Sequence, residues 1–111
     1  MIEKIVLDYL SATLSVPVYM EVPAKPPDVF VLVEKTGSSR ANRVNRATLA
    51  VQSWTKTMSA AAELNEEVKA VMDGLSELDS VSACRLNSDY NFTDITTKHY
   101  RYQAVFDLVF Y

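Results

Sequence analysis

The chain has few of the residues that most often perform chemistry in enzymes. Its 111 residues include one cysteine, one histidine and two glycines. A lone cysteine excludes an intramolecular disulfide, and one cysteine with one histidine cannot supply the donors of a typical zinc site. We expect Cys84 to be a small buried hydrophobic residue rather than a nucleophile. Phosphate-binding loops are rich in glycine, so the two glycines disfavour a nucleotide-binding fold.

The chain also lacks a long apolar run. None approaches the roughly 18 residues that a membrane-spanning helix needs. Acidic side chains interrupt the apolar residues of segment 1–8, and no cleavage site follows them, so we expect neither a signal peptide nor a membrane partner. We expect a cytosolic protein, in which the glycosylation sequon Asn91-Phe92-Thr93 is a chance match.

What is present is typical of one globular domain that spans residues 1–111. Hydrophobic residues make up 49% of the chain and charged residues 23%, which are ordinary values for such a domain. A chain of this length buries roughly two-thirds of its unfolded surface, which is enough for a hydrophobic core. The net charge of -3 repels nucleic acid and anionic membranes unless a local basic patch overrules it.

The segment from Ala47 to Leu75 indicates a strand that leads directly into a helix. Apolar residues alternate with a period of two as far as Trp54, and from Met58 onward they recur about every 3.6 residues. The helix is predicted over residues 58–75. Its buried stripe is expected to consist of Ala61, Leu64, Val68, Val71, Met72 and Leu75.

The remaining pattern predicts a first helix over residues 2–14 and further strands. Strands are expected at about 18–22, 29–35, 46–55, 80–90 and 97–110. The element order α-β-β-β-α-β-β indicates an α+β fold, a two-layer sandwich in which both helices cover one face of a mostly antiparallel sheet of four to five strands. The other face carries valine and aromatic residues, so we expect it to need a second cover, for which a partner subunit is the simplest candidate.

No group of residues indicates an active site. His99 is expected to be structural or exposed to solvent, and Trp54 to anchor the core or a hairpin rather than stack on a ligand. The carboxylates Asp73, Glu77 and Asp79 are expected to lie at a solvated helix end rather than bind a metal. We therefore predict no catalytic, cofactor-binding or metal-binding residues, no cofactor and no enzyme activity.

The longest polar stretch, residues 36–45, joins two strands that are expected to form a hairpin. It exceeds the two to five residues of most hairpin connections, and such loops often carry function. Four basic or polar residues in and beside it are candidates for an interface: Arg40, Asn42, Arg43 and Arg46. The arginines either keep a hairpin tip soluble or dock on carboxylates, for example on an acidic patch of a second copy. Nucleic-acid contact is less favoured, because no aromatic platform or basic helix accompanies them.

Three parts of the sequence carry a resemblance to a known family. They are Ala50-Val51-Gln52-Ser53-Trp54; Ala60-Ala61-Ala62-Glu63-Leu64 with Val68 and Val71; and the closing segment Tyr100-Arg101-Tyr102-Gln103-Ala104-Val105-Phe106-Asp107-Leu108. Together with the short first helix and the proline-flanked strand before Val29, they resemble the tail terminator proteins of long-tailed bacteriophages. These are also called tail completion or minor tail proteins, and the resemblance covers nearly the whole chain.

The resemblance implies a phage or prophage protein that forms a ring, usually of six subunits. Such a ring caps the tail tube at full length, stops its polymerisation and offers a surface to the head–tail connector, while DNA only passes through it. The implied partners are further copies of the chain, the tail tube protein and the head–tail connector protein. The implied location is the virion tail, or the host cytoplasm during assembly. On this interpretation the four candidate residues contact an adjacent subunit or the tube.

Two alternatives stay open at this point. Head–tail connector and neck proteins are also small and also form rings. A small α+β domain that binds or transforms a metabolite belongs to a different class, and it would need a polar pocket with titratable groups.

Overall fold

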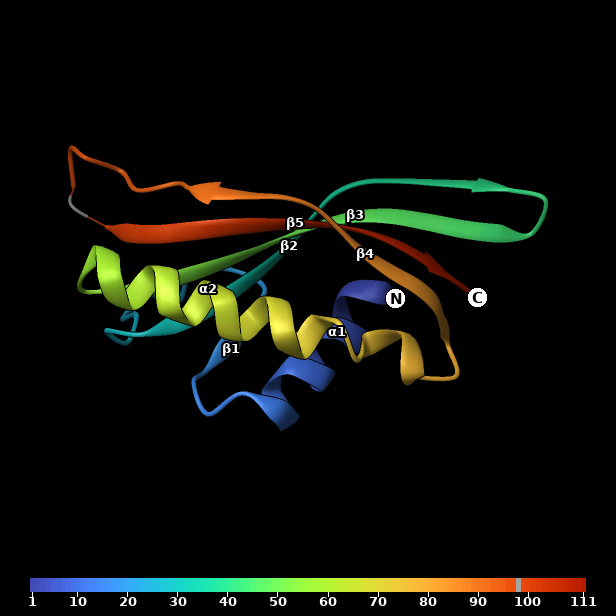
Figure 1. The fold of residues 1–111 in the computed structure, drawn as a ribbon, viewed down its shortest axis with the longest axis horizontal. Coiled ribbons are helices and arrows are strands. Elements are labelled where there is room, and N and C mark those ends of the chain that lie inside the picture. Colours follow the sequence, from blue (N-terminus) through green and yellow to red (C-terminus); the bar gives the residue numbers. More distant parts are fainter. Residues whose placement is uncertain (98) are drawn as a thin grey trace.

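Two helices lie on one face of a five-stranded mixed sheet (Figure 1). The computed structural model describes residues 1–97 and 99–111. The elements in chain order are α1 (Ile2–Thr13), β1 (Val18–Tyr19), β2 (Phe30–Ala41), β3 (Val44–Thr55), α2 (Met58–Met72), the short 3-10 helix η1 (Leu75–Glu77), β4 (Val81–Asn91) and β5 (Tyr100–Phe110). The predicted α+β class and element order are confirmed, and η1 is an addition.

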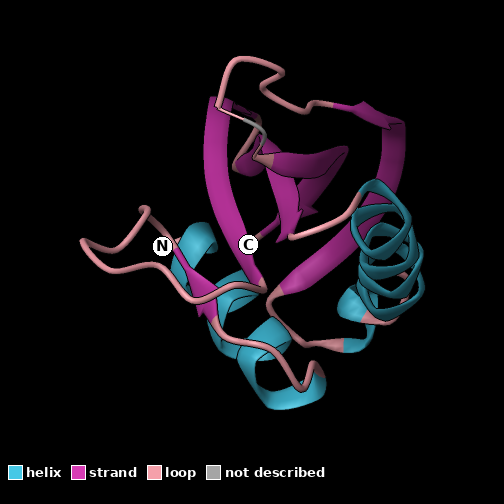
Figure 2. Cartoon of the chain, turned by 90° about the vertical axis from the view of Figure 1, so that its left-hand side faces the viewer, coloured by secondary structure: helices cyan, strands magenta, loops and turns pink. Residues whose placement is uncertain are grey.

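The strands are ordered β1-β2-β3-β5-β4 across the sheet. Only β1 is parallel to its neighbour; the other pairs are antiparallel. β1 pairs with β2 only at Val31 and Leu32, so the rest of that edge of β2 has no strand neighbour among the described residues. The long strands give the molecule extents of 44 × 25 × 25 Å, and the view along the long axis shows how strongly they twist (Figure 2).

The hydrophobic core lies between the helices and the sheet. The helices contribute every third or fourth residue to the core, and strands β3 and β5 contribute alternate residues. The core residues include Ile2, Val6 and Leu10 of α1, Ala61, Leu64, Val68 and Met72 of α2, and Leu49, Val51, Ala104, Phe106 and Leu108 of the sheet. Ala61, Leu64, Val68 and Met72 belong to the stripe that the sequence predicts for α2, and Val71 of that stripe is partly buried. Both helices cover the same face of the sheet (Figure 1).

Specific hydrogen bonds mark both ends of helix α2. The hydroxyl of Thr57 accepts a hydrogen bond from the backbone N–H of the third residue after it, at 3.1 Å, and so caps the first turn. At the other end the carbonyl of Val71 accepts from the Gly74 N–H at 3.1 Å and from the Tyr9 hydroxyl at 2.9 Å. The helix therefore ends at Met72, earlier than predicted, and the chain continues as η1.

The prediction of a long loop over residues 36–45 is wrong, because these residues continue the two strands. β2 and β3 stay paired as far as Ala41 and Val44, and only Asn42 and Arg43 form the turn. The residues of β2 from 34 onward are exposed. Because both faces of this end of the hairpin meet solvent, no apolar alternation marks the strands in the sequence.

The other strands differ from prediction mainly at their ends. β1 has two residues, where residues 18–22 were predicted, because Met20 and the residues after it leave the sheet. β4 closely matches its prediction of 80–90. β5 begins at Tyr100, whereas the predicted strand begins at 97; Thr97 lies in a turn, and Lys98 lies outside the described residues.

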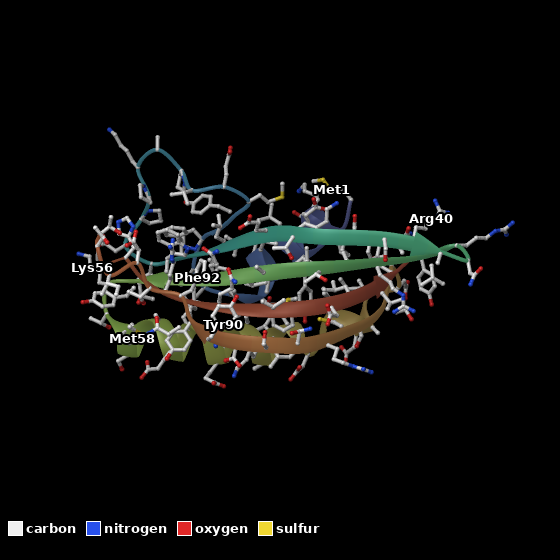
Figure 3. All side chains as sticks on the ribbon, turned by 90° about the horizontal axis from the view of Figure 1, so that it is seen from above. Met1, Arg40, Lys56, Met58, Tyr90 and Phe92 are labelled. Atoms are coloured by element: carbon white, nitrogen blue, oxygen red, sulfur yellow. The ribbon has the colours of Figure 1, made fainter. Side chains whose placement is uncertain are left out.

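The outer face of the sheet, opposite the helices, is partly closed by its own side chains. Phe30 and Trp54 stack with ring centroids 5.1 Å apart, and Tyr19 meets Phe30 edge-on at 5.8 Å. Phe30 is only 2% exposed, so this part of the face is shielded within one copy. The expectation that the whole face needs a second cover is therefore too broad. Tyr90 and Phe92 are the aromatic residues there that remain 43% and 40% exposed (Figure 3).

Candidate interaction surface

The four predicted interface residues come together at the end of the β2–β3 hairpin. Arg40 pairs with Asn45 in the β2–β3 register, and Arg46 pairs with Ser39. Asn42 and Arg43 form the turn between the strands. All four predicted residues are exposed. The hairpin extends past the helices at one end of the molecule (Figure 1), and Arg40 lies at that end (Figure 3). We call this group, Arg40, Asn42, Arg43 and Arg46, the hairpin tip.

The hairpin tip presents its arginines in different directions. Arg46 precedes the core residue Ala47 on β3, so it lies on the outer face of the sheet, because successive strand residues alternate between faces. Arg40 pairs with Asn45, and directly opposite residues share a face, so it lies on the helix side. Arg43 stands at the turn. A partner that meets the hairpin end-on is therefore flanked by guanidinium groups.

The positive charge of the hairpin tip is not compensated within the described residues. None of its three arginines forms an ion pair with a carboxylate of residues 1–97 or 99–111. Asp107, on the neighbouring strand β5, is already engaged: its carboxylate accepts hydrogen bonds from the Thr48 hydroxyl at 3.1 Å and from the Asn87 amide at 2.9 Å. The guanidinium groups are therefore available to carboxylates from outside the chain.

The turn itself holds two residues in the left-handed region. Asn42 has a φ of 52° and Arg43 a φ of 65°, as in a type I′ turn, whose second position favours glycine. Asparagine tolerates this conformation, but for a residue such as arginine it costs roughly 1–2 kcal/mol. The chain thus keeps a strained, charged residue at the tip of the hairpin. Strain of this kind is concentrated at functional sites.

A groove of about 550 Å³ adjoins the hairpin on the outer face of the sheet. Its lining includes Arg46, Thr48, Arg85 and Asp107. Arg85 of β4 lies opposite Asp107 of β5 in the strand register and adds a fourth arginine to this end of the molecule. Sequence analysis missed Arg85, because only the register of β4 on β5 brings it near the hairpin.

The opposite end of the outer face holds an aromatic cluster. The guanidinium of Arg101 lies 4.6 Å from the ring centroid of Trp54 and 4.8 Å from that of Phe92. His99, which is exposed, lies against Trp54 with ring centroids 5.4 Å apart. The Trp54 indole N–H donates to Gln52 at 2.9 Å. Trp54 therefore anchors the hairpin β2–β3 in this cluster, as predicted.

The other candidate residues do not gather into a site in this structure. Cys84 is partly buried against the core, and this burial, followed by the nearby charge of Asp73, raises the pKa of its thiol to about 11. A thiol that stays protonated at neutral pH is a poor nucleophile. Asp73, Glu77 and Asp79 are exposed. Within residues 1–97 and 99–111, no three histidine, cysteine, aspartate or glutamate side chains are grouped so that they could hold a metal ion.

Comparisons with known proteins add no family to these observations. The chain matches no protein-family model, and it matches no curated protein. In the part of the chain that the structure describes, no helix is both long and apolar enough to cross a membrane. A proposal for function therefore rests on the hairpin tip, the exposed aromatic residues and the resemblance noted in the sequence.

Proposed function

We propose that the chain is a structural assembly protein that acts as the terminator of a phage-type tail. It forms a ring on the tail tube, stops further polymerisation of the tube and presents a surface to the head connector. The resemblance of segments 50–71 and 100–108 to tail terminators supplies the specific role. This function makes and breaks no covalent bond, so the chain is not an enzyme on this proposal.

The observation that carries the proposal is the projecting hairpin with three uncompensated arginines. The β2 side of its outer half contributes little to the core, since every residue from Glu34 through Arg43 is exposed. A closed ring needs two different surfaces on each subunit, one meeting the other on the next copy. An arm that extends past the body of the domain and carries unpaired guanidinium groups is suited to be one of these surfaces.

The exposed aromatic pair on the outer face supports a second contact. Tyr90 and Phe92 meet edge-on with centroids 6.1 Å apart, and both are about two-fifths exposed. Aromatic residues are enriched in protein–protein interfaces relative to the rest of the surface. The terminator role requires a face for the tube or the connector besides the contacts between subunits, and this pair is our candidate for that face.

The test reverses the charge of the hairpin tip without touching the core. We expect the wild-type chain to form rings at millimolar concentration in negative-stain micrographs. The variant Arg40→Glu/Arg43→Glu/Arg46→Glu should keep its circular dichroism spectrum but form no rings. A control, Lys25→Glu/Lys56→Glu, reverses two exposed lysines outside the hairpin tip and should assemble as the wild type does. Unchanged assembly of the triple variant would remove the hairpin from the proposal.

A neck or connector position is separated from a terminator position by purified tails. A terminator stays bound to tails that lack heads, whereas a neck protein leaves with the head. Labelling of the chain in micrographs of headless tails therefore decides between these two positions in the particle.

A further inference from the structure

Helix α2 carries an acidic surface that is the charge complement of the hairpin tip. Residues 58–72, which form α2, contain three carboxylates and one lysine, and three more carboxylates follow in residues 73–79, whereas residues 37–50 contain three arginines and no acid. The lysine, Lys69, is fully engaged: its ammonium lies 2.8 Å from Glu66 and 3.0 Å from Asp89. These contacts raise the pKa of Lys69 and keep it charged. Lys69 therefore does not pair with Glu63 or Glu67, the other carboxylates of α2.

Two of those carboxylates lie one helical turn apart on α2. Glu63 and Glu67 are exposed, and in the described part of the chain neither forms an ion pair. Like charges at this spacing face each other on the helix surface and destabilise it. A cationic partner placed between them would relieve the repulsion. Glu63 and Glu67 are therefore suited to bind a cationic side chain of a neighbouring molecule.

The two charged surfaces lie toward opposite ends of the molecule. Arg40 lies at one end of the long axis and Met58, the first residue of α2, at the other (Figure 3), and the molecule is 44 Å long. The N-terminal half of α2, which includes Glu63, is thus remote from the hairpin of the same copy. Complementary surfaces at opposite ends of one chain build head-to-tail contacts, which close into rings when the rotation between copies allows it.

We propose that the hairpin tip of one copy docks on Glu63 and Glu67 of α2 in the next copy. The occupant of the acidic surface is thus a second copy of this chain. Arg43 at the turn meets the helix end-on, and Arg40 and Arg46 flank the contact from the two faces of the hairpin. Guanidinium groups pair with carboxylates through two parallel hydrogen bonds, which sets the register of one copy on the next. This inference rests on the proposed function, because it names the surface that receives the hairpin in the ring.

A charge-swap experiment tests this pairing. Variant A carries Arg40→Glu/Arg43→Glu/Arg46→Glu, and variant B carries Glu63→Lys/Glu67→Lys. Each variant alone sets like charges against each other at every contact, so each should lose self-association at least about tenfold in sedimentation velocity. In an equal mixture, the hairpin of A faces the helix of B, and the hairpin of B faces the helix of A. The mixture should therefore restore assembly, in rings that alternate the two variants.

Controls separate this inference from the proposed function. Asp73→Lys/Asp79→Lys reverses two other exposed carboxylates and should assemble as the wild type does. Assembly of the wild type should weaken as salt rises, because salt screens exposed charges. If variant B assembles normally while variant A does not, the hairpin docks elsewhere, and the inference falls while the proposed function stands. If A and B together stay dissociated, the pairing is also wrong. If the wild type stays monomeric at millimolar concentration, both proposals fall.

Discussion

The side-chain amide of Gln52 donates a hydrogen bond to Oε1 of Gln103, 2.8 Å away across β3 and β5. Gln52 in turn accepts from the Trp54 indole, and Gln103 donates to the Tyr90 hydroxyl. Both glutamines are buried, at 5% and 8% exposed. These hydrogen bonds therefore join β3, β5 and β4 on the outer face. They also give partners to side-chain polar atoms that would otherwise be buried without one.

Replacement of Gln103 by leucine should destabilise the fold. The amide of Gln52 would stay buried without its acceptor, and such a loss costs about 1–3 kcal/mol. Urea unfolding followed by circular dichroism measures the change. The double variant Gln52→Leu/Gln103→Leu should cost less than the sum of the two single variants, because each single change already breaks the same bond. Additive costs would show that the two amides are not coupled.

Replacement of Arg43 by glycine should stabilise the monomer and weaken the self-assembly that we propose. Glycine adopts a positive φ without steric cost, so we expect a gain of about 0.5–1 kcal/mol after its greater freedom in the unfolded chain is counted. Thermal unfolding at low concentration measures stability, and sedimentation velocity measures association. Arg43→Ala is the matched control, since it removes the guanidinium but keeps the strain. A glycine variant with lower stability would contradict the strained turn.

Replacement of Gly74 by alanine should destabilise the contact between α1 and α2. A Cβ at this position would lie 2.6 Å from the Tyr9 hydroxyl oxygen, so the tyrosine must move and lose its hydrogen bond to Val71, worth about 1 kcal/mol. Adding Tyr9→Phe removes the oxygen that the Cβ would meet. Gly74→Ala should therefore cost less free energy of unfolding in the Tyr9→Phe background than in the wild type. An equal cost in both backgrounds would place the strain elsewhere.

The raised pKa of Cys84 predicts both slow alkylation and a pH-dependent stability. With a pKa of about 11 in place of 9.0, the thiolate fraction at pH 8 falls about 100-fold, and iodoacetamide should react correspondingly slowly. The unfolded thiol loses its proton first, so this contribution to stability is complete below about pH 9 and is lost as the pH rises toward 11. Urea titrations of the wild type and Cys84→Ala measure it: the wild type should lose more stability over that interval.

The passage from strand β3 to helix α2 could be predicted because burial on one side gives each element its own spacing of apolar residues. Apolar residues of β3 alternate with polar ones because one face of the strand meets the core. Apolar residues of α2 recur every three or four positions because one stripe of the helix meets the core. Thr57 marks the boundary, since its side chain caps the helix. Burial on one side only is what makes such patterns visible in a sequence.

The hairpin tip could not be predicted in the same way. From Glu34 to Arg43 both faces of β2 meet solvent, so the residues obey no alternation and resemble a polar loop. The three arginines were still named as candidates, because their charge is visible without structure, and their role stays a prediction. Arg85 was not, because its place beside the hairpin depends on two register shifts in β4, between Val81 and Ala83 and between Leu86 and Ser88, which no local pattern encodes.

The open edge of β2 has a consequence for how copies of the chain can meet. Bare strand edges invite other chains to add on as further strands, which leads to uncontrolled aggregates. Here Lys35 and Arg40 stand along the edge, and Thr36 is an extra residue that breaks the regular β2–β3 pairing between Lys35 and Gly37. Charge and irregularity of this kind discourage backbone joining. If copies of the chain assemble as proposed, their contacts are thereby left to side chains, which can form, separate and be corrected while the ring is being built.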